Sequence, residues 1–126
     1  RGAIGEKRYA QGRFAEAATH LKESVRLDPS NPEARYLLAL ALAGQGLIEE
    51  TVEHYARSIA LKPEIDSSVA LHELLSGNYA KAGRLDEAIR SAQRALQLAR
   101  ATGKNDLAGR ISARLARYQA DRASGR

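Results

Sequence analysis

The chain has 126 residues and a formal net charge of +5, and it contains no cysteine, methionine or tryptophan. This length allows about one domain with a core of its own, and the lack of cysteine excludes disulfides, thiolate metal sites and thiol nucleophiles. The longest apolar run, residues 36–43, is far shorter than the roughly 20 residues of a membrane-spanning helix.

Three segments of the chain repeat one another. They begin at Gly12, Gly46 and Gly83 and read GRFAEAATHLKESVRLDP, GLIEETVEHYARSIALKP and GRLDEAIRSAQRALQLAR. The first interval is 34 residues and the second is 37, with three extra residues around 65–68. Apolar residues spaced by three and four predict a helix in each segment, and each glycine predicts the end of the helix before it.

In chain order, this pattern predicts seven helices and no strand. The helices cover residues 3–11, 14–27, 33–44, 48–61, 69–82, 85–101 and 106–122. Asn31 before Pro32 predicts the start of the third helix, and Asp66, Ser67 or Ser68 can cap the fifth.

A helix-turn-helix period of 34 residues resembles the tetratricopeptide repeat (TPR) family. The signature positions of the second repeat hold Arg35, Leu38, Ala39, Leu42, Thr51, Tyr55 and Pro63. Those of the third repeat hold His72, Leu75, Ser76, Tyr79, Ala88, Ala92 and Arg100. In the first repeat Arg8 stands where an aromatic residue is usual and only Arg1 occupies the first signature position, so the front of that hairpin is expected to be truncated.

The resemblance implies an all-α fold, an α-α superhelix of about three helical hairpins with a C-terminal capping helix. The hairpins are expected at residues 1–31, 32–65 and 66–102, the capping helix at 103–122 and a tail at 123–126. Where the two helices of a hairpin cross, the family needs small residues. Those positions here include Ala39 and Ser76 on first helices, and Ala17, Thr51 and Ala88 on second helices.

The resemblance further implies that the first helices of the hairpins line a concave groove. Its positions are Tyr9, Glu33, Tyr36, Leu40, Ala43, Glu73, Gly77, Ala80 and Lys81, with Leu37 and Leu74 at its margin. We therefore expect a non-catalytic scaffold that binds a peptide, a partner helix or a neighbouring domain there. The alternative that some of these side chains pack on their own neighbours stays open. Family members that bind chaperone tails hold a carboxylate with lysine and asparagine, and that clamp is missing.

The last predicted helix carries the excess charge of the chain. Residues 100–126 hold seven Lys or Arg against two Asp, whereas residues 1–99 are neutral. Arg110, Arg114 and Arg117 lie beside an apolar face formed by Leu107, Ile111, Leu115 and Tyr118. Binding of RNA or acidic lipid is the alternative function. Asp106 and Asp121, each four residues from an arginine, predict intrahelical ion pairs and a solvated face, and the lack of interleaved aromatic residues argues against nucleic acid.

Nothing in the sequence indicates catalysis, a cofactor or a metal. His20 and His54 occupy the same repeat position, so about 10 Å of helix spacing would separate them. No phosphate-binding loop, nucleophile elbow or HExxH motif is present. The start inside a hairpin leads us to expect a C-terminal part of a longer protein, or self-association through the uncapped first repeat. Residues 71–122 resemble the C-terminal ends of bacterial TPR-rich proteins.

Overall fold

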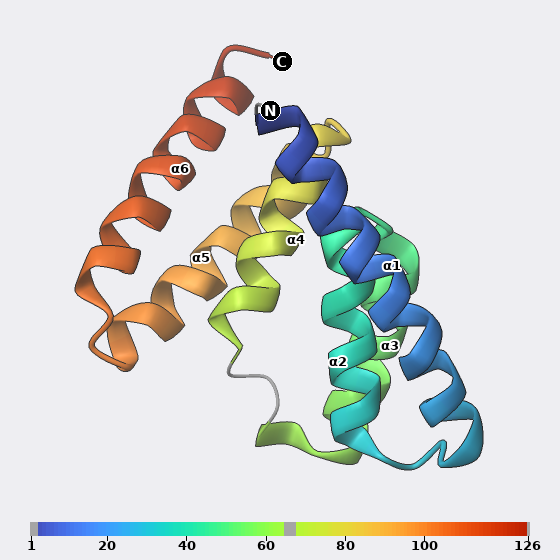
Figure 1. Ribbon diagram of the computed structural model, residues 1–126. Coiled ribbons are helices and arrows are strands. Elements are labelled where there is room, and N and C mark those ends of the chain that lie inside the picture. The colour runs from blue at the N-terminus through green and yellow to red at the C-terminus, as the bar shows by residue number, and fades with distance from the viewer. Residues whose placement is uncertain (1–2, 65–67, 126) are drawn as a thin grey trace. The chain divides into compact units, whose positions relative to one another are not determined.

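The computed structural model describes the backbone of residues 3–64 and 68–125, and the side chains of these ranges from residue 12 onward. Six α-helices and no strand lie within the described residues, so the predicted all-α fold is confirmed (Figure 1). They are α1 (Ala3–Leu27), α2 (Pro32–Gly44), α3 (Ile48–Leu61), α4 (Val69–Lys81), α5 (Leu85–Ala101) and α6 (Asn105–Ala123). None of the helices in the described part is long and apolar enough to cross a membrane.

The chain divides into two compact units, Arg1–Asp66 and Ser67–Arg126. Unit 1 holds α1, α2 and α3, and unit 2 holds α4, α5 and α6. Within each unit, consecutive helices pack against each other.

The prediction of two helices over residues 3–27 is wrong, because α1 runs without a break through Gly12. Gly46 and Gly83 end their turns with φ of 80° and 78°, a left-handed conformation that glycine adopts without strain. Glycine permits that conformation but does not enforce it. Inside a helix it costs only about 1 kcal/mol relative to alanine, which is too little to interrupt helical hydrogen bonds on both sides.

The caps predicted for the starts of α2 and α4 are present. Asn31 accepts a hydrogen bond from the backbone N–H of Ala34 at 3.2 Å, and Pro32 follows it as the first helical residue. Ser68 caps α4 by accepting from the N–H of Leu71 at 3.1 Å. Asp66 and Ser67, the alternative caps, lie outside the described residues.

The core of unit 1 lies between α1, α2 and α3. Leu38 and Leu42 of α2 are fully buried together with Ala18 and Val25 of α1. The ring of Phe14 packs directly on Gly44, where a Cβ would lie 2.4 Å from the ring. The predicted small crossing residues Ala39 and Thr51 are fully buried, and Ala17 is half-buried.

The core of unit 2 packs a row of small side chains on α5 against α4 and α6. Ala88, Ala92, Ala95 and Ala99 of α5 are fully buried between α4 and α6, and so is the predicted crossing residue Ser76. The apolar face predicted for the last helix is present, because α6 buries Ile111, Leu115 and Tyr118 and half-buries Leu107. Small side chains let these helices approach closely, as their crossing requires.

Candidate partner-binding surfaces

In unit 1, a row of side chains on α2 faces away from the core. Glu33, Tyr36, Leu37 and Leu40 recur at intervals of three and four residues and so share one helix face, here called the α2 stripe. Glu33 and Leu37 are exposed, Leu37 with 48% of its surface, and the other two are half-buried. The core is formed by a different face of α2, which carries Leu38, Ala39 and Leu42.

Two residues of the α2 stripe also contact their own hairpin. The ring of Tyr36 lies 6.5 Å from that of Tyr55 on α3, tilted by 46°. Glu33 accepts a hydrogen bond from Lys62 Nζ at 2.8 Å, which lowers the pKa of Glu33 and raises that of Lys62. The packing alternative left open by the sequence therefore holds for Tyr36, whose ring is oriented by Tyr55 while part of it stays exposed.

The other predicted positions of unit 1 differ in their outcome. Ala43 is buried, so its assignment to an open groove is wrong: it lies four residues from Ala39, on the core-facing side of α2. Tyr9 belongs to α1, but its side chain lies outside the described residues.

In unit 2, the corresponding row of α4 is less exposed than the α2 stripe and has a charged residue near each end, Glu73 and Lys81. Glu73, Leu74, Gly77 and Ala80 are half-buried, and Lys81 is exposed. No heavy atom lies within 4 Å of the point where a side chain on Gly77 would begin. The row therefore contains a gap at which another chain could approach the backbone of α4.

The arginines of α6 connect to this row. Arg114 Nη1 donates to Glu73 Oε2 on α4 at 3.4 Å, and Arg122 Nη1 donates to Asp86 Oδ1 at the start of α5 at 3.0 Å. Arg110 and Arg117 are exposed. In the described part of the chain, the ion pairs predicted for Asp106 and Asp121 are not formed, and the ion pairs that α6 does make come from Arg114 and Arg122 and run to other helices. Two regions that the sequence treats separately, the α4 row and the arginines, thus meet at one ion pair.

Comparisons with known proteins agree with the helical-repeat fold. A family model described as "TPR repeat" matches residues 5–46. The "TPR repeat-containing thioredoxin TTL4" of Arabidopsis thaliana is 31% identical over 86 residues, which is 68% of this chain and 12% of that protein. The chain belongs to the tetratricopeptide-repeat family.

Two solved structures share the TPR fold of this chain. The crystal structure of PcrH in complex with the chaperone binding region of PopD has a TM-score of 0.70 at 21% identity, covering 95% of this chain and 89% of that one. The Yersinia enterocolitica type III secretion translocator chaperone SycD has a TM-score of 0.70 at 15% identity, covering 96% and 82%. These likenesses confirm the predicted fold class.

At the signature position where many TPR sequences carry tryptophan, unit 1 buries Arg35. Its Nε donates to the carbonyl of Pro29 at 2.9 Å, and its Nη1 lies 3.3 Å from Nδ1 of His54. Because a guanidinium can only donate, Nδ1 accepts and the ring proton belongs on Nε2. Burial and then the charge of Arg35 lower the pKa of His54. The shared repeat position of His20 and His54 gave no sign of this contact.

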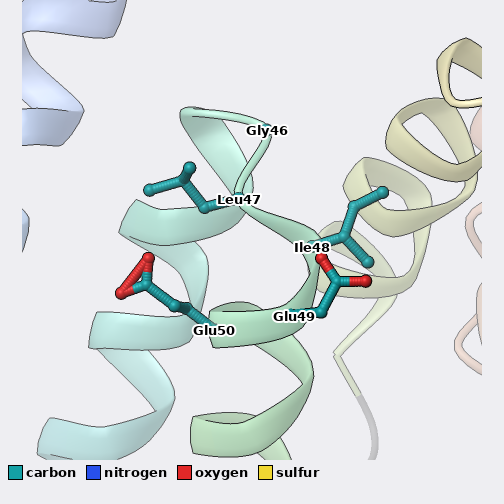
Figure 2. A pocket seen from close by; sticks show the side chains of 5 residues that line it. All are labelled: Gly46, Leu47, Ile48, Glu49 and Glu50. Atoms are coloured by element: carbon teal, nitrogen blue, oxygen red, sulfur yellow. The ribbon is translucent and has the colours of Figure 1, made fainter.

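A shallow depression of about 190 Å³ adjoins the turn between α2 and α3 of the TPR hairpin. Figure 2 shows Leu47 and Glu50 on one side of this turn and Ile48 and Glu49 on the other. Glu50 also lies 4.0 Å from Lys22 Nζ on α1. The two carboxylates point apart and so do not converge on one ligand. Among the described residues, no group of three histidine, cysteine or acidic side chains could hold a metal ion.

Proposed function

We propose that the α2 stripe binds an extended, partly apolar segment of a protein partner. The observation that carries the proposal is Leu37, a leucine with 48% of its surface exposed between the half-buried Tyr36 and Leu40. Full burial of a leucine is worth about 1.5–3 kcal/mol, so covering the exposed half of Leu37 supplies a useful part of a binding energy. Tyr36 adds a large contact surface that Tyr55 already orients, which reduces the entropy lost on binding.

The comparisons support this choice of partner. TPR proteins are protein-interaction scaffolds, and the PcrH structure is described as a complex with the chaperone binding region of PopD. A segment of another protein is therefore the class of ligand that we propose for this chain. The proposed role is binding without chemistry. Glu49 and Glu50, like Asp86 and Glu87, begin helices, where acids are favoured by the helix dipole.

A phage-displayed library of linear peptides, selected on the purified chain, tests the proposal. Leu37→Asp should weaken binding of the selected peptides by at least about fivefold, since loss of an interface anchor costs more than about 1 kcal/mol. The matched control is Leu61→Asp at the end of α3, because Leu61 is 46% exposed but lies outside the stripe. Helix content measured by circular dichroism should be the same in all three proteins.

Equal loss of binding in Leu37→Asp and Leu61→Asp would mean that the library recognises exposed leucines in general, and it would remove the α2 stripe as the site. Unchanged affinity in Leu37→Asp would also contradict the proposal.

A further inference from the structure

We propose that the rows of α4 and α6 in unit 2 form a second binding surface, which takes an acidic segment of a protein partner. We call it the α4–α6 surface and define it by Glu73, Gly77, Lys81, Arg110, Arg114 and Arg117. In this proposal Glu73 occupies Arg114 until a carboxylate of the partner replaces it. The inference rests on the proposed function, the binding of protein segments, and adds that the segment bound by unit 2 is acidic.

The placement of the surface comes from one contact and two helical spacings. Arg114 reaches Glu73 on α4, which fixes the side of α6 that faces the α4 row. Arg110 precedes Arg114 by four residues and Arg117 follows it by three, so all three arginines share that flank of α6. On α4, Gly77 and Lys81 follow Glu73 at intervals of four and share its face.

The charge of this surface selects an anionic ligand. The surface holds four cationic side chains and one carboxylate, that of Glu73, and Asp106 and Asp121 lie near the two ends of the arginine row in the sequence. Unit 2 as a whole has eleven Lys or Arg and five Asp or Glu, a difference of +6. Such a field raises the encounter rate with acidic segments and disfavours basic ones.

The ion pair between Glu73 and Arg114 is easily exchanged. It is a single contact of 3.4 Å between side chains that are 26% and 41% exposed. Pairs of this kind contribute at most about 1 kcal/mol. By contrast, Arg84 holds Glu87 through two nitrogens, Nε and Nη2. A partner carboxylate that meets Arg114 in such a two-nitrogen geometry would therefore bind it better than Glu73 does.

The shape and composition of the surface favour a protein segment over a nucleic acid. The open space beside Gly77 lets a peptide backbone come close to α4. None of the six residues that define the surface is aromatic, so it lacks the stacking platform by which single-stranded nucleic acids are usually held. An acidic peptide needs only the guanidinium and ammonium groups that are present.

The test measures fluorescence anisotropy of a labelled peptide of alternating glutamate and alanine, with a glutamine and alanine peptide as the neutral reference. Arg114→Gln should weaken binding by about three- to fivefold, the range expected for one exposed ion pair. Glu73→Gln should tighten it by about the same factor, because Arg114 becomes available. Loss of the fold would remove the arrangement of these side chains, so a gain of affinity in Glu73→Gln with unchanged helix content is the sign expected of the released Arg114.

Asp86→Asn is the matched control, because it removes the same charge from the other ion pair between α6 and a neighbouring helix, Asp86–Arg122. We expect little change in this variant. An equal gain of affinity for the glutamate peptide in Asp86→Asn and Glu73→Gln would mean that only the net charge of the chain matters, and it would overturn the proposal. Tighter binding of an oligothymidylate of matched charge, with the same gain in Glu73→Gln, would overturn the choice of a protein ligand.

The result also separates this inference from the function of the α2 stripe. Leu37→Asp should leave the affinity for the glutamate peptide almost unchanged, since it alters unit 1 alone. If the glutamate peptide fails to bind while library peptides still depend on Leu37, the acidic-segment proposal is wrong and the α2 stripe remains. The reverse pattern removes the stripe and keeps the α4–α6 surface.

Discussion

Unit 1 and unit 2 are built from the same repeat, yet their surfaces differ in net charge and in the number of exposed apolar side chains. Unit 1 has nine Lys or Arg against ten Asp or Glu and exposes Leu27, Leu37, Leu47, Val52 and Leu61. Unit 2 has eleven against five, and among its described residues no large apolar side chain is exposed. The difference shows that the repeat constrains the buried positions and leaves the outward positions free to differ in charge and polarity.

The interiors of the two units are correspondingly more alike, though not identical. Each has a pair of small residues at its helix crossing, Ala39 with Thr51 in unit 1 and Ser76 with Ala88 in unit 2. The buried hydroxyls are satisfied locally, because Thr51 donates to the carbonyl of Leu47 and Ser76 to that of Glu73. Unit 1 differs in burying a charged group, Arg35, which no equivalent in the core of unit 2 matches among the described residues.

The largest expected effect concerns the crossing in unit 2. Ala88 is fully buried, so Ala88→Leu would force extra methylenes into a packed interface. We expect it to lower the free energy of unfolding by about 1–3 kcal/mol, as measured by urea denaturation. Ala101→Leu at the exposed end of the same helix serves as the reference and should be close to neutral. Equal stability of the two variants would show that the crossing has room.

A glycine pair compares the two units directly. Gly44→Ala in α2 would place a methyl group 2.4 Å from the ring of Phe14, and we expect a loss of about 1–2 kcal/mol. Gly77→Ala in α4 meets open space, and we expect a gain of up to about 1 kcal/mol from the better helix propensity of alanine. Thermal unfolding followed by circular dichroism gives both signs. Two changes of the same sign would refute the contrast between a filled and an open position.

These features differ in how far the sequence could predict them. The caps Asn31 and Ser68, the buried crossing residues and the apolar face of α6 depend on local pattern and repeat period, and all were predictable. The continuation of α1 through Gly12 was not predictable, because the same local sequence signal accompanies the end of a helix at Gly46. The helix end depends on whether a packed turn replaces the lost hydrogen bonds, and that information is not local.

The contacts between distant side chains were the second gap. Glu73 and Arg114 are 41 positions apart, and Arg35 and His54 are 19 apart. The repeat places each residue on a helix and a face, but the reach of a long side chain across helices depends on its rotamer and on its neighbours. For that reason Asp106 and Asp121 were predicted as the partners of the arginines of α6, and the link from α6 to α4 was missed.

The smallest expected effect is a pH dependence of stability that comes from His54 in unit 1. The pKa of His54 lies below its ordinary value of 6.5, first because of burial and then because of Arg35, with Arg57 acting in the same direction and Glu53 and Glu50 opposing. Below about pH 6.5, His54 is therefore protonated in the unfolded chain at pH values where it is still neutral in the folded chain. The folded chain therefore has its full stability above the pKa that His54 has in the unfolded chain. It loses stability as the pH falls from there toward the lower pKa of His54 in the folded chain.

His54→Gln should remove this loss, while an amide oxygen can still accept from Arg35. Between about pH 7.5 and pH 5.5, the wild-type melting temperature should fall more than that of His54→Gln. The difference should be worth less than about 1 kcal/mol, because solvent screens a half-exposed imidazole. His20→Gln changes the repeat-equivalent, exposed histidine and should follow the wild type. Parallel curves for wild type and His54→Gln would mean that the buried guanidinium of Arg35 does not oppose protonation of His54.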